Sequence, residues 1–330
     1  MKKVMNAPVD FVDEMLEGLC AAHPHYFAQP EKRVIARAGG PVSGKVGIVT
    51  GGGSGHLPIF TGYIGPGLLD ACAIGDVFAS PSAETMASSM RRANGGAGVL
   101  RLYGNYGGDV MNFDMAGEML EMEDIRSTTV LLADDVASAP PAEAAKRRGV
   151  AGMVFAFKAA GARAEERGDL DEVTAAAQKT ADACRSIGFA LTPCIVPQAG
   201  KPTFTIGDDE MEMGMGIHGE PGIWRDKLKP ADAVTDEMLD RLLEDSGIGR
   251  GERISVLVNS LGATPLEELY IVYRRLRARL TDAGIGIVEP LVGRYATSME
   301  MAGVTLSICR LDREIERLLA APCDCPYWKK

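Results

Sequence analysis

Short apolar segments that are typical of buried strands alternate along this chain with longer segments that carry a helical pattern of apolar residues. This alternation constrains the fold most, because a strand–helix–strand succession places consecutive strands side by side in a parallel sheet. The pattern predicts strands at 45–50, 98–103 and 129–134, and helices at 10–22, 80–95, 110–122 and 141–187. Ser80 and Pro81 are expected to begin the second helix, and Gly188 to end the last. The fold class is therefore α/β, with a largely parallel sheet flanked by helices.

The character of the chain changes after residue 188, where prolines become frequent and methionines alternate with other residues. The alternation predicts a strand with Met211, Met213 and Met215 on one side, and we interpret these methionines as core residues. Thr264 and Pro265 are expected to begin a helix. The further elements expected are strands at 253–262, 285–293 and 303–311 and a helix at 264–280. The sequence thus predicts two α/β domains, 1–188 and 189–330, the second smaller and with a mixed sheet.

The composition argues against several classes of protein. The 330 residues are 46% hydrophobic and carry a formal net charge of −10, so the molecule repels nucleic acid and anionic membranes. Acidic residues stand where a signal peptide needs an apolar run, which predicts a cytoplasmic protein. The seven cysteines are an odd number and are expected to be core residues. Cys323 and Cys325 are one residue too close for a CxxC pattern, so we predict no metal site.

Two glycine-containing segments each follow an expected strand, and ligands of open α/β sheets bind at such strand ends. The first, GGGSGH at 51–56, favours phosphate and small-polyol binding about equally. It lacks both the lysine of a P-loop and the acidic ribose partner of a dinucleotide fold, which argues against an oxidoreductase. The second, NYGGD at 105–109, ends in Asp109. This aspartate either caps the following helix or faces the same crevice as His56, where it would serve as a general base.

A third segment, GMGIHGEPG at 214–222, holds His218 among four glycines. An isolated histidine is more often structural than catalytic. Here the glycines provide little side-chain volume to bury the ring, so we expect the imidazole to be clear of packed neighbours and open to a small ligand. His23 and His25 lie at the end of an expected helix and fit a structural role better.

Together, the segments GGGSGH, GDVFASPS (75–82), NYGGDVMNF (105–113) and GMGIHGEPG resemble the substrate-binding K subunit of the dihydroxyacetone kinase family. The likeness extends over essentially the whole chain. It implies a homodimer of two-domain α/β subunits that holds a short ketose covalently, as a hemiaminal between Nε2 of His218 and the ketone. Asp109 with His56 would activate the terminal hydroxyl for phosphorylation. The substrate contacts that the resemblance implies are Gly53, Ser54, Gly55, His56, Ser80 and Asp109.

The nucleotide-binding motif of the family's L domain has no match in this sequence. The resemblance therefore implies no cofactor on this chain and a separate L subunit. That subunit would carry either ADP, rephosphorylated by a phosphotransferase-system phosphocarrier, or ATP with magnesium. Two positions depart from the family, because Gly104 replaces a substrate-contacting lysine and Leu57 replaces a glutamate. Loss of the lysine removes a donor and opens volume, so we hypothesise a ketose such as erythrulose as the substrate.

The resemblance also leaves a second function open, because some relatives bind the ketose without phosphorylating it and act as coactivators of a transcription regulator. A sensor needs the histidine that forms the adduct but does not need a general base. The presence of both His56 and Asp109 therefore favours the kinase interpretation. Gly104 argues modestly for the sensor.

Overall fold

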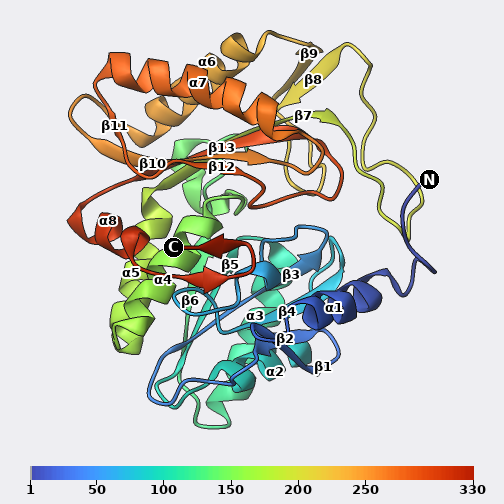
Figure 1. Ribbon diagram of the computed structural model, residues 1–330, viewed down its shortest axis with the longest axis vertical. Helices are drawn as coiled ribbons and strands as arrows, with labels where there is room; N and C mark the ends of the chain where they lie inside the picture. The colour runs from blue at the N-terminus through green and yellow to red at the C-terminus, as the bar shows by residue number, and fades with distance from the viewer. Residues whose placement is uncertain (1) are drawn as a thin grey trace.

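The computed structural model describes residues 2–330, which form two large sheets with helices on their faces (Figure 1). The strands of the first sheet are β1 (Phe27–Glu31), β2 (Val34–Arg37), β3 (Gly47–Ser54), β4 (Ala71–Val77), β5 (Val99–Gly104) and β6 (Ser127–Leu132). Their order is β1-β2-β4-β3-β5-β6. The four strands β4, β3, β5 and β6 run parallel, while β1 and β2 are antiparallel to their neighbours. The predicted α/β class is confirmed.

Helices cover both faces of this sheet. One face packs against α2 (Ala83–Ala93) and α3 (Gly107–Glu121), through a core that includes Met86 and Phe113. The other face packs against α4 (Met153–Glu165) and α5 (Leu170–Ala183). Nearly every residue of α4 is buried, because the core around it also takes in Leu257 and Cys309 of the second sheet. The helices α4 and α5 therefore join the two sheets. The remaining helical segments of this lobe are α1 (Phe11–Ala22), η1 (Thr61–Tyr63) and η2 (Pro141–Lys146).

The second sheet is mixed and lies above the first in Figure 1. Its strands are β7 (Cys184–Thr192), β8 (Glu210–Met213), β9 (Trp224–Lys227), β10 (Arg253–Ser260), β11 (Gly286–Ile287), β12 (Leu291–Gly293) and β13 (Ala302–Arg310). The outer face is covered by α6 (Ala231–Ser246) and α7 (Leu266–Ala283). Met211, Met213 and Met215 are buried, which confirms their assignment to the core. Within residues 2–330, no helix has both the length and the apolar character that crossing a bilayer requires.

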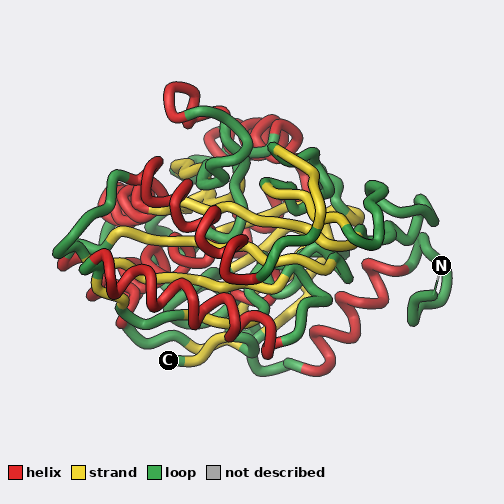
Figure 2. Tube along the Cα trace, turned by 90° about the horizontal axis from the view of Figure 1, so that it is seen from above, coloured by secondary structure: helices red, strands yellow, loops and turns green. Residues whose placement is uncertain are grey.

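The C-terminal segment returns to the first lobe. It contains α8 (Arg313–Ala320) and a small hairpin of β14 (Asp324–Cys325) and β15 (Trp328–Lys329). Leu318, Cys323 and Cys325 join the core around α4, and the buried Lys158 donates from Nζ to the carbonyl of Leu318 at 3.0 Å. The two chain ends lie apart in both views (Figures 1 and 2). The contacts of Leu318, Cys323 and Cys325 with the core around α4 tie the last residues of the chain to the lobe formed by its first half.

Several predicted element boundaries are wrong. Ser82 caps α2 by accepting from the backbone N–H of Thr85, and Ser80 lies in the preceding turn. Thr264 does not cap α7 with its side chain; its hydroxyl donates to the carbonyl of Gly303. The helical region expected to reach Gly188 ends at residue 183, because residues 184–192 pair with β13 as strand β7. Residue 188, our expected domain boundary, lies inside that strand, and the position of the boundary stays a prediction.

The glycines of GGGSGH also differ from expectation. They were expected to form a loop, but residues 51–54 continue β3 and are fully buried. Residues 51–53 pair with residues 73–75 of β4, which keeps them in the strand. Residue 53 is a glycine because the next segment lies close, since a Cβ on Gly53 would lie 2.6 Å from the backbone nitrogen of Ala79. The loop begins only at Gly55. The strand thus delivers His56 directly to the edge of the sheet.

Candidate functional site

The predicted site residues meet where the carboxyl ends of three parallel strands lie side by side. His56 follows β3, Phe78 and Ser80 follow β4, and Asp109 stands in the first turn of α3 after β5. His218 arrives from the second lobe on the loop between β8 and β9. The neighbours β4, β3 and β5 form the centre of the first sheet, and such strand ends are the usual ligand site of open α/β folds. The fold therefore unites residues that are far apart in the sequence.

His56 is buried, with 1% of its surface exposed, and one ring nitrogen is fixed by the second lobe. Its Nδ1 lies 2.7 Å from the carbonyl oxygen of Thr297, so Nδ1 carries the proton and donates. Nε2 is then left with a lone pair, and it has no hydrogen-bond partner among residues 2–330. Burial, together with the nearby His218, lowers the pKa of His56 to about 3. The ring is thus a neutral proton acceptor at neutral pH.

His218 is more enclosed than we expected. Only 23% of its side chain is exposed, because rings from the first lobe surround it. Ring centroids lie 4.7 Å away for Tyr106, 4.8 Å for His56 and 5.3 Å for Phe78, all in edge-to-face contact. The expectation of a ring clear of packed neighbours is wrong. The neighbours come from distant segments, which the glycines beside His218 gave no means to foresee.

Glu220 holds the His218 ring by its Nδ1. The carboxylate oxygen Oε1 lies 2.8 Å from Nδ1, while Oε2 accepts from the backbone N–H of His218 at 2.9 Å. Burial by itself would raise the pKa of Glu220, but the hydrogen bond and charge of His218 outweigh it and lower the pKa to about 2. Glu220 is therefore ionised and accepts a hydrogen bond from the Nδ1–H of His218. In the neutral imidazole this leaves Nε2 with the free lone pair.

Asp109 is buried, with 9% of its surface exposed. Its Oδ1 finds no hydrogen-bond partner in the part of the chain that the structure describes. Burial raises the pKa of this carboxyl to about 6, although the Ser80 side chain and the charge of His218 partly oppose the shift. A carboxyl with this pKa is mostly ionised at neutral pH but remains basic enough to accept a proton. Asp109 also lies in the first turn of α3, and Tyr106 occupies the cap position.

The remaining predicted contacts line the same edge. Gly53 and Ser54 are the last residues of β3, and the carbonyl of Gly55 accepts from the backbone N–H of Met299 at 2.8 Å. Ser80 is half-buried, and its hydroxyl oxygen lies 3.3 Å from Nδ2 of Asn112. All the predicted site residues are thus gathered at the junction of the two lobes, whereas His23 and His25 lie after α1. Within residues 2–330, no cluster of side chains suited to hold a metal ion is present.

Sequence reasoning missed three residues of this site. Glu220 and Tyr106 stand inside segments that we singled out, and the spacing of Glu220 two residues after His218 was an available signal. Thr297, in contrast, is 241 residues from His56 and binds through its backbone carbonyl. A backbone acceptor leaves no trace in residue type. The arrangement as a whole places Nε2 of His218 close to the neutral imidazole of His56 and to the buried carboxyl of Asp109.

Comparison with known proteins identifies the family. The Dak1 domain matches residues 17–327. The chain is 45% identical over 331 residues to the PTS-dependent dihydroxyacetone kinase 2, dihydroxyacetone-binding subunit DhaK, of Listeria innocua, covering 100% of this chain and 99% of that protein. It is 44% identical over 330 residues to the D-erythrulose kinase of Mycolicibacterium smegmatis. That match covers 100% of this chain and 57% of the kinase.

A solved structure gives the same answer for the fold. The dihydroxyacetone kinase operon co-activator Dha-DhaQ superposes with a TM-score of 0.90 at 30% identity, covering 96% of this chain and 98% of that one. Kinases that act on dihydroxyacetone or erythrulose transfer a phosphoryl group to an alcohol. The sequence match and the shared two-lobed architecture agree over nearly the full length. This chain therefore belongs to the Dak1 family and is a phosphotransferase of the dihydroxyacetone kinase type.

Proposed function

We propose that this chain binds a short ketose covalently on His218 and presents its terminal hydroxyl for phosphorylation. One observation carries the proposal. His218, bound at Nδ1 by Glu220, lies 4.8 Å from the ring of His56, and both the His56 Nε2 and the Asp109 Oδ1 are buried without partners in residues 2–330. Buried polar atoms are normally hydrogen-bonded, so these two are the natural partners of a bound polar ligand.

The chemistry follows from the protonation states. The lone pair on Nε2 of His218 forms a bond to the ketone carbon, the π pair moves to oxygen, and that oxygen takes a proton. The ring gives up its Nδ1 proton through Glu220 to solvent, and solvent supplies the proton on the oxygen. The net change moves one proton from Nδ1 to the new hydroxyl, so the adduct contains every atom of both reactants and no water is lost. The terminal hydroxyl then gives its proton to Asp109 or His56 as its oxygen attacks the terminal phosphorus of the donor ATP, and the bond from that phosphorus to the leaving ADP breaks. Glycerol has no carbonyl and is excluded by this bond.

The phosphoryl donor is expected on a second protein. The relative named DhaK is itself called a subunit, and the D-erythrulose kinase extends well beyond the part that this chain matches. We propose a nucleotide-binding L subunit that carries ATP with magnesium, or ADP recharged by a phosphocarrier. We place the reaction in the cytoplasm, as the sequence of the N-terminal segment predicts. A homodimer is expected from the family resemblance alone.

Gly104 directs the choice of substrate. It is buried, and an added Cβ would lie 3.3 Å from the ring of Tyr106, which in turn contacts His218. The same Cβ would lie 3.1 Å from the carbonyl oxygen of Gly149 and 3.3 Å from Sδ of Met153, so a lysine here requires these neighbours to shift before it can extend towards His218. Leu57, the other departure, packs against the core of the first lobe. The chain is 44% identical to a D-erythrulose kinase and 45% identical to a dihydroxyacetone-binding subunit, so the proposal of a four-carbon ketose rests on Gly104 and not on overall identity.

The test mixes this chain with its cognate L subunit and a phosphoryl donor and offers dihydroxyacetone and both erythruloses. Intact mass of the K subunit reports the adduct, and phosphate transfer is followed in parallel. His218→Ala should lose the adduct, whereas Asp109→Ala should keep the adduct and lose transfer. An adduct on His218→Ala, or full transfer by Asp109→Ala, overturns the assigned roles.

Substrate choice is tested with Gly104→Lys. The added ammonium should crowd the fourth carbon and donate to a triose hydroxyl, shifting the kcat/KM ratio towards dihydroxyacetone by about tenfold or more, which corresponds to roughly 1.4 kcal/mol. Gly107→Lys, at the exposed first residue of α3 with open space around it, is the control. A wild-type preference for dihydroxyacetone over the tetruloses contradicts the substrate proposal but leaves the reaction class intact.

A sensor is the second candidate, because the co-activator Dha-DhaQ shares the whole architecture. A sensor would form the adduct, but would transfer no phosphate with any donor or L subunit. The kinase interpretation predicts both events in the wild-type protein. The two functions therefore give different results in the same assay.

A further inference from the structure

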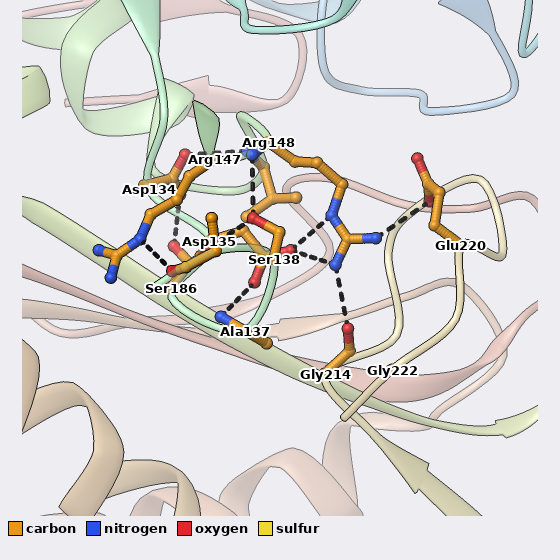
Figure 3. Close-up of polar contacts among 12 residues, drawn as sticks. Asp134, Asp135, Ala137, Ser138, Arg147, Arg148, Ser186, Gly214, Glu220 and Gly222 are labelled. Atoms are coloured by element: carbon orange, nitrogen blue, oxygen red, sulfur yellow. Dashed lines mark hydrogen bonds and ion pairs between the residues drawn. The ribbon is translucent and has the colours of Figure 1, made fainter. Parts of the chain in front are cut away.

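Arg148 reaches from the first lobe to the loop that carries His218 (Figure 3). Its Nε donates to Oδ2 of Asp135 at 2.9 Å, and Nη2 donates to the carbonyl of Gly214 at 3.1 Å. On the other side, Nη1 lies 3.9 Å from Oε2 of Glu220. The Arg148 side chain is 15% exposed, so these contacts are only partly screened by water. The guanidinium thus bridges a buried carboxylate and both ends of the turn that holds His218.

The backbone on either side of Arg148 is firmly anchored. Its own N–H donates to the Ser138 hydroxyl at 3.0 Å. The buried Asp134 accepts from the backbone N–H of Val150 at 2.9 Å and from the Ser186 hydroxyl at 2.5 Å, which ties this segment to the second sheet. Such a network leaves the guanidinium little freedom to move. Its position relative to the His218 loop is therefore set by the fold.

Gly216 allows this contact. A Cβ on this residue would overlap both the Glu220 carboxylate and Nη1 of Arg148. The absence of a side chain at residue 216 is therefore what lets the cation and the carboxylate approach each other.

Burial raises the pKa of Asp135 to about 6. Above that pH the charges along this chain of contacts alternate from Asp135 to Arg148 to Glu220, and Glu220 faces the His218 ring. A carboxylate at hydrogen-bond distance favours the protonated imidazole, and a protonated ring has no lone pair for a carbonyl. A permanent cation beside that carboxylate weakens its pull on the proton. The other titratable groups that face the His218 ring are His56, Tyr106 and Asp109. Of these, His56 is neutral at the pH of the reaction.

We propose that Arg148 is a positioning residue that acts through Glu220: it holds the His218 loop by the Gly214 carbonyl and offsets the carboxylate charge, so that the imidazole stays neutral and able to add to a ketone. The inference rests on the proposed function, because it concerns the histidine that forms the adduct. Arg148 itself touches no reacting atom in this arrangement. It sets the pH range over which the adduct forms.

The test measures adduct formation as a function of pH from 5 to 8.5 by intact mass, with dihydroxyacetone and erythrulose as probes. The acid limb is the low-pH side of this profile, where the adduct is lost as the His218 ring takes up a proton. Arg148→Gln should move the acid limb upward by about one pH unit, which is a tenfold change in the proton affinity of the ring. Arg148→Lys keeps the charge and should restore most of the limb. Glu220→Gln removes the carboxylate charge and should move the limb downward.

A double-variant cycle separates this role from a structural one. If Arg148 acts through Glu220, Arg148→Gln should have almost no effect on the acid limb in the Glu220→Gln background. Arg225→Gln is the matched control, because Arg225 binds Glu212, which accepts from the backbone N–H of Gly222 at the far end of the same loop. This control should loosen the loop and leave the acid limb within about 0.3 pH units.

Arg148→Gln removes the cation that pairs with the buried carboxylate of Asp135. If this variant does not fold, the double variant Arg148→Gln with Asp135→Asn removes both charges and takes its place. An acid limb unchanged in both variants, or a shift of equal size in the Glu220→Gln background, overturns the inference. The outcomes for the proposed function are separate. If the wild-type protein forms no adduct at any pH, the proposed function fails; if it does and the variants match it, only the role of Arg148 fails.

Discussion

At the scale of single residues, the site depends on what each ring nitrogen faces. His56 and His218 both have Nδ1 fixed by an oxygen acceptor, the carbonyl of Thr297 in one case and the carboxylate of Glu220 in the other. The same tautomer results from two acceptors of different charge. A neutral acceptor in a buried place keeps His56 uncharged, whereas a carboxylate binds either charge state of His218. This difference explains why His56 is suited to accept a proton. It also explains why the charge of the carboxylate beside His218 needs a counter-charge.

The raised pKa of Asp109 predicts how phosphate transfer depends on pH. Because a base must be ionised to accept the hydroxyl proton, transfer from the preformed adduct should be slow below the pKa of about 6 and reach a plateau above it. His56, with a pKa near 3, should contribute no further limb above pH 5. Single-turnover transfer, divided by adduct occupancy at each pH, measures this profile.

Asp109→Asn should remove that limb and slow transfer by about 10²- to 10⁴-fold, while leaving adduct formation in place. Asp114→Asn, an exposed aspartate on the same helix, provides the control and should keep the wild-type profile. If Asp109→Asn retained a limb near pH 6, another group would have to be the base.

At the scale of elements, α2 shows how a cap and a site residue are separated. The sequence segment SPS contains two serines, and only Ser82 accepts from the helix backbone. Ser82→Ala should therefore lower the free energy of unfolding by about 1 kcal/mol, because one helix N–H loses its partner. Ser80→Ala should change it by less than about 0.5 kcal/mol. Urea unfolding of the two variants measures the difference.

For phosphate transfer the order should be reversed, with Ser80→Ala having the larger effect and Ser82→Ala the smaller. Ser80 lies beside Asp109 and opposes the rise of its pKa, so Ser80→Ala should shift the transfer profile upward in pH. Ser82→Ala should leave that profile in place. A stability loss for Ser80→Ala equal to that of Ser82→Ala would restore our original assignment of the cap.

At the scale of the whole molecule, the lobes are joined by buried charge pairs as well as by apolar packing. Asp245 on α6 binds Arg147 in the segment before α4 and Arg185 at the start of β7. The Asp245 and Arg147 side chains are 8% and 1% exposed. Asp245→Asn leaves two arginines without their carboxylate and should reduce the free energy of unfolding by about 3–5 kcal/mol. Asp240→Asn, on the same helix, disrupts an ion pair between the exposed Asp240 and Arg279 of α7 and should cost less than about 1 kcal/mol.

The same pair predicts an acid sensitivity. Burial alone would raise the pKa of Asp245, but the hydrogen bonds from Arg147 and Arg185 outweigh it and lower the pKa below that of a free carboxyl. The folded state therefore binds the proton less tightly than the unfolded state. The stabilisation is fully present above about pH 4 and is lost as the pH falls through the lower folded-state value. Unfolding of wild type and Asp245→Asn should converge at low pH; curves that remain parallel would contradict this.

The strand–helix alternation, the apolar character of the strands and the residue types of the three glycine-rich segments are properties of the sequence alone. The alternation was enough to predict the α/β class, because consecutive strand–helix units form a parallel sheet. That His56, Asp109 and His218 share one site was implied by the resemblance of their segments to the dihydroxyacetone kinase family, and the residue pattern alone left the role of Asp109 open. The element boundaries failed where a local signal was ambiguous, as with two serines before α2.

Only the tertiary structure decided the protonation and environment of these residues. The acceptor for His56 is a backbone carbonyl 241 residues away, and the rings around His218 come from the other lobe. Burial, which raises the pKa of Asp109 and lowers that of His56, is likewise a property of the packed lobes. The alternating charges from Asp135 to Glu220 exist because folding brings segments from both sheets within a few ångströms. The sequence thus determines which groups are available, and the packing of the two lobes determines their charge and reactivity.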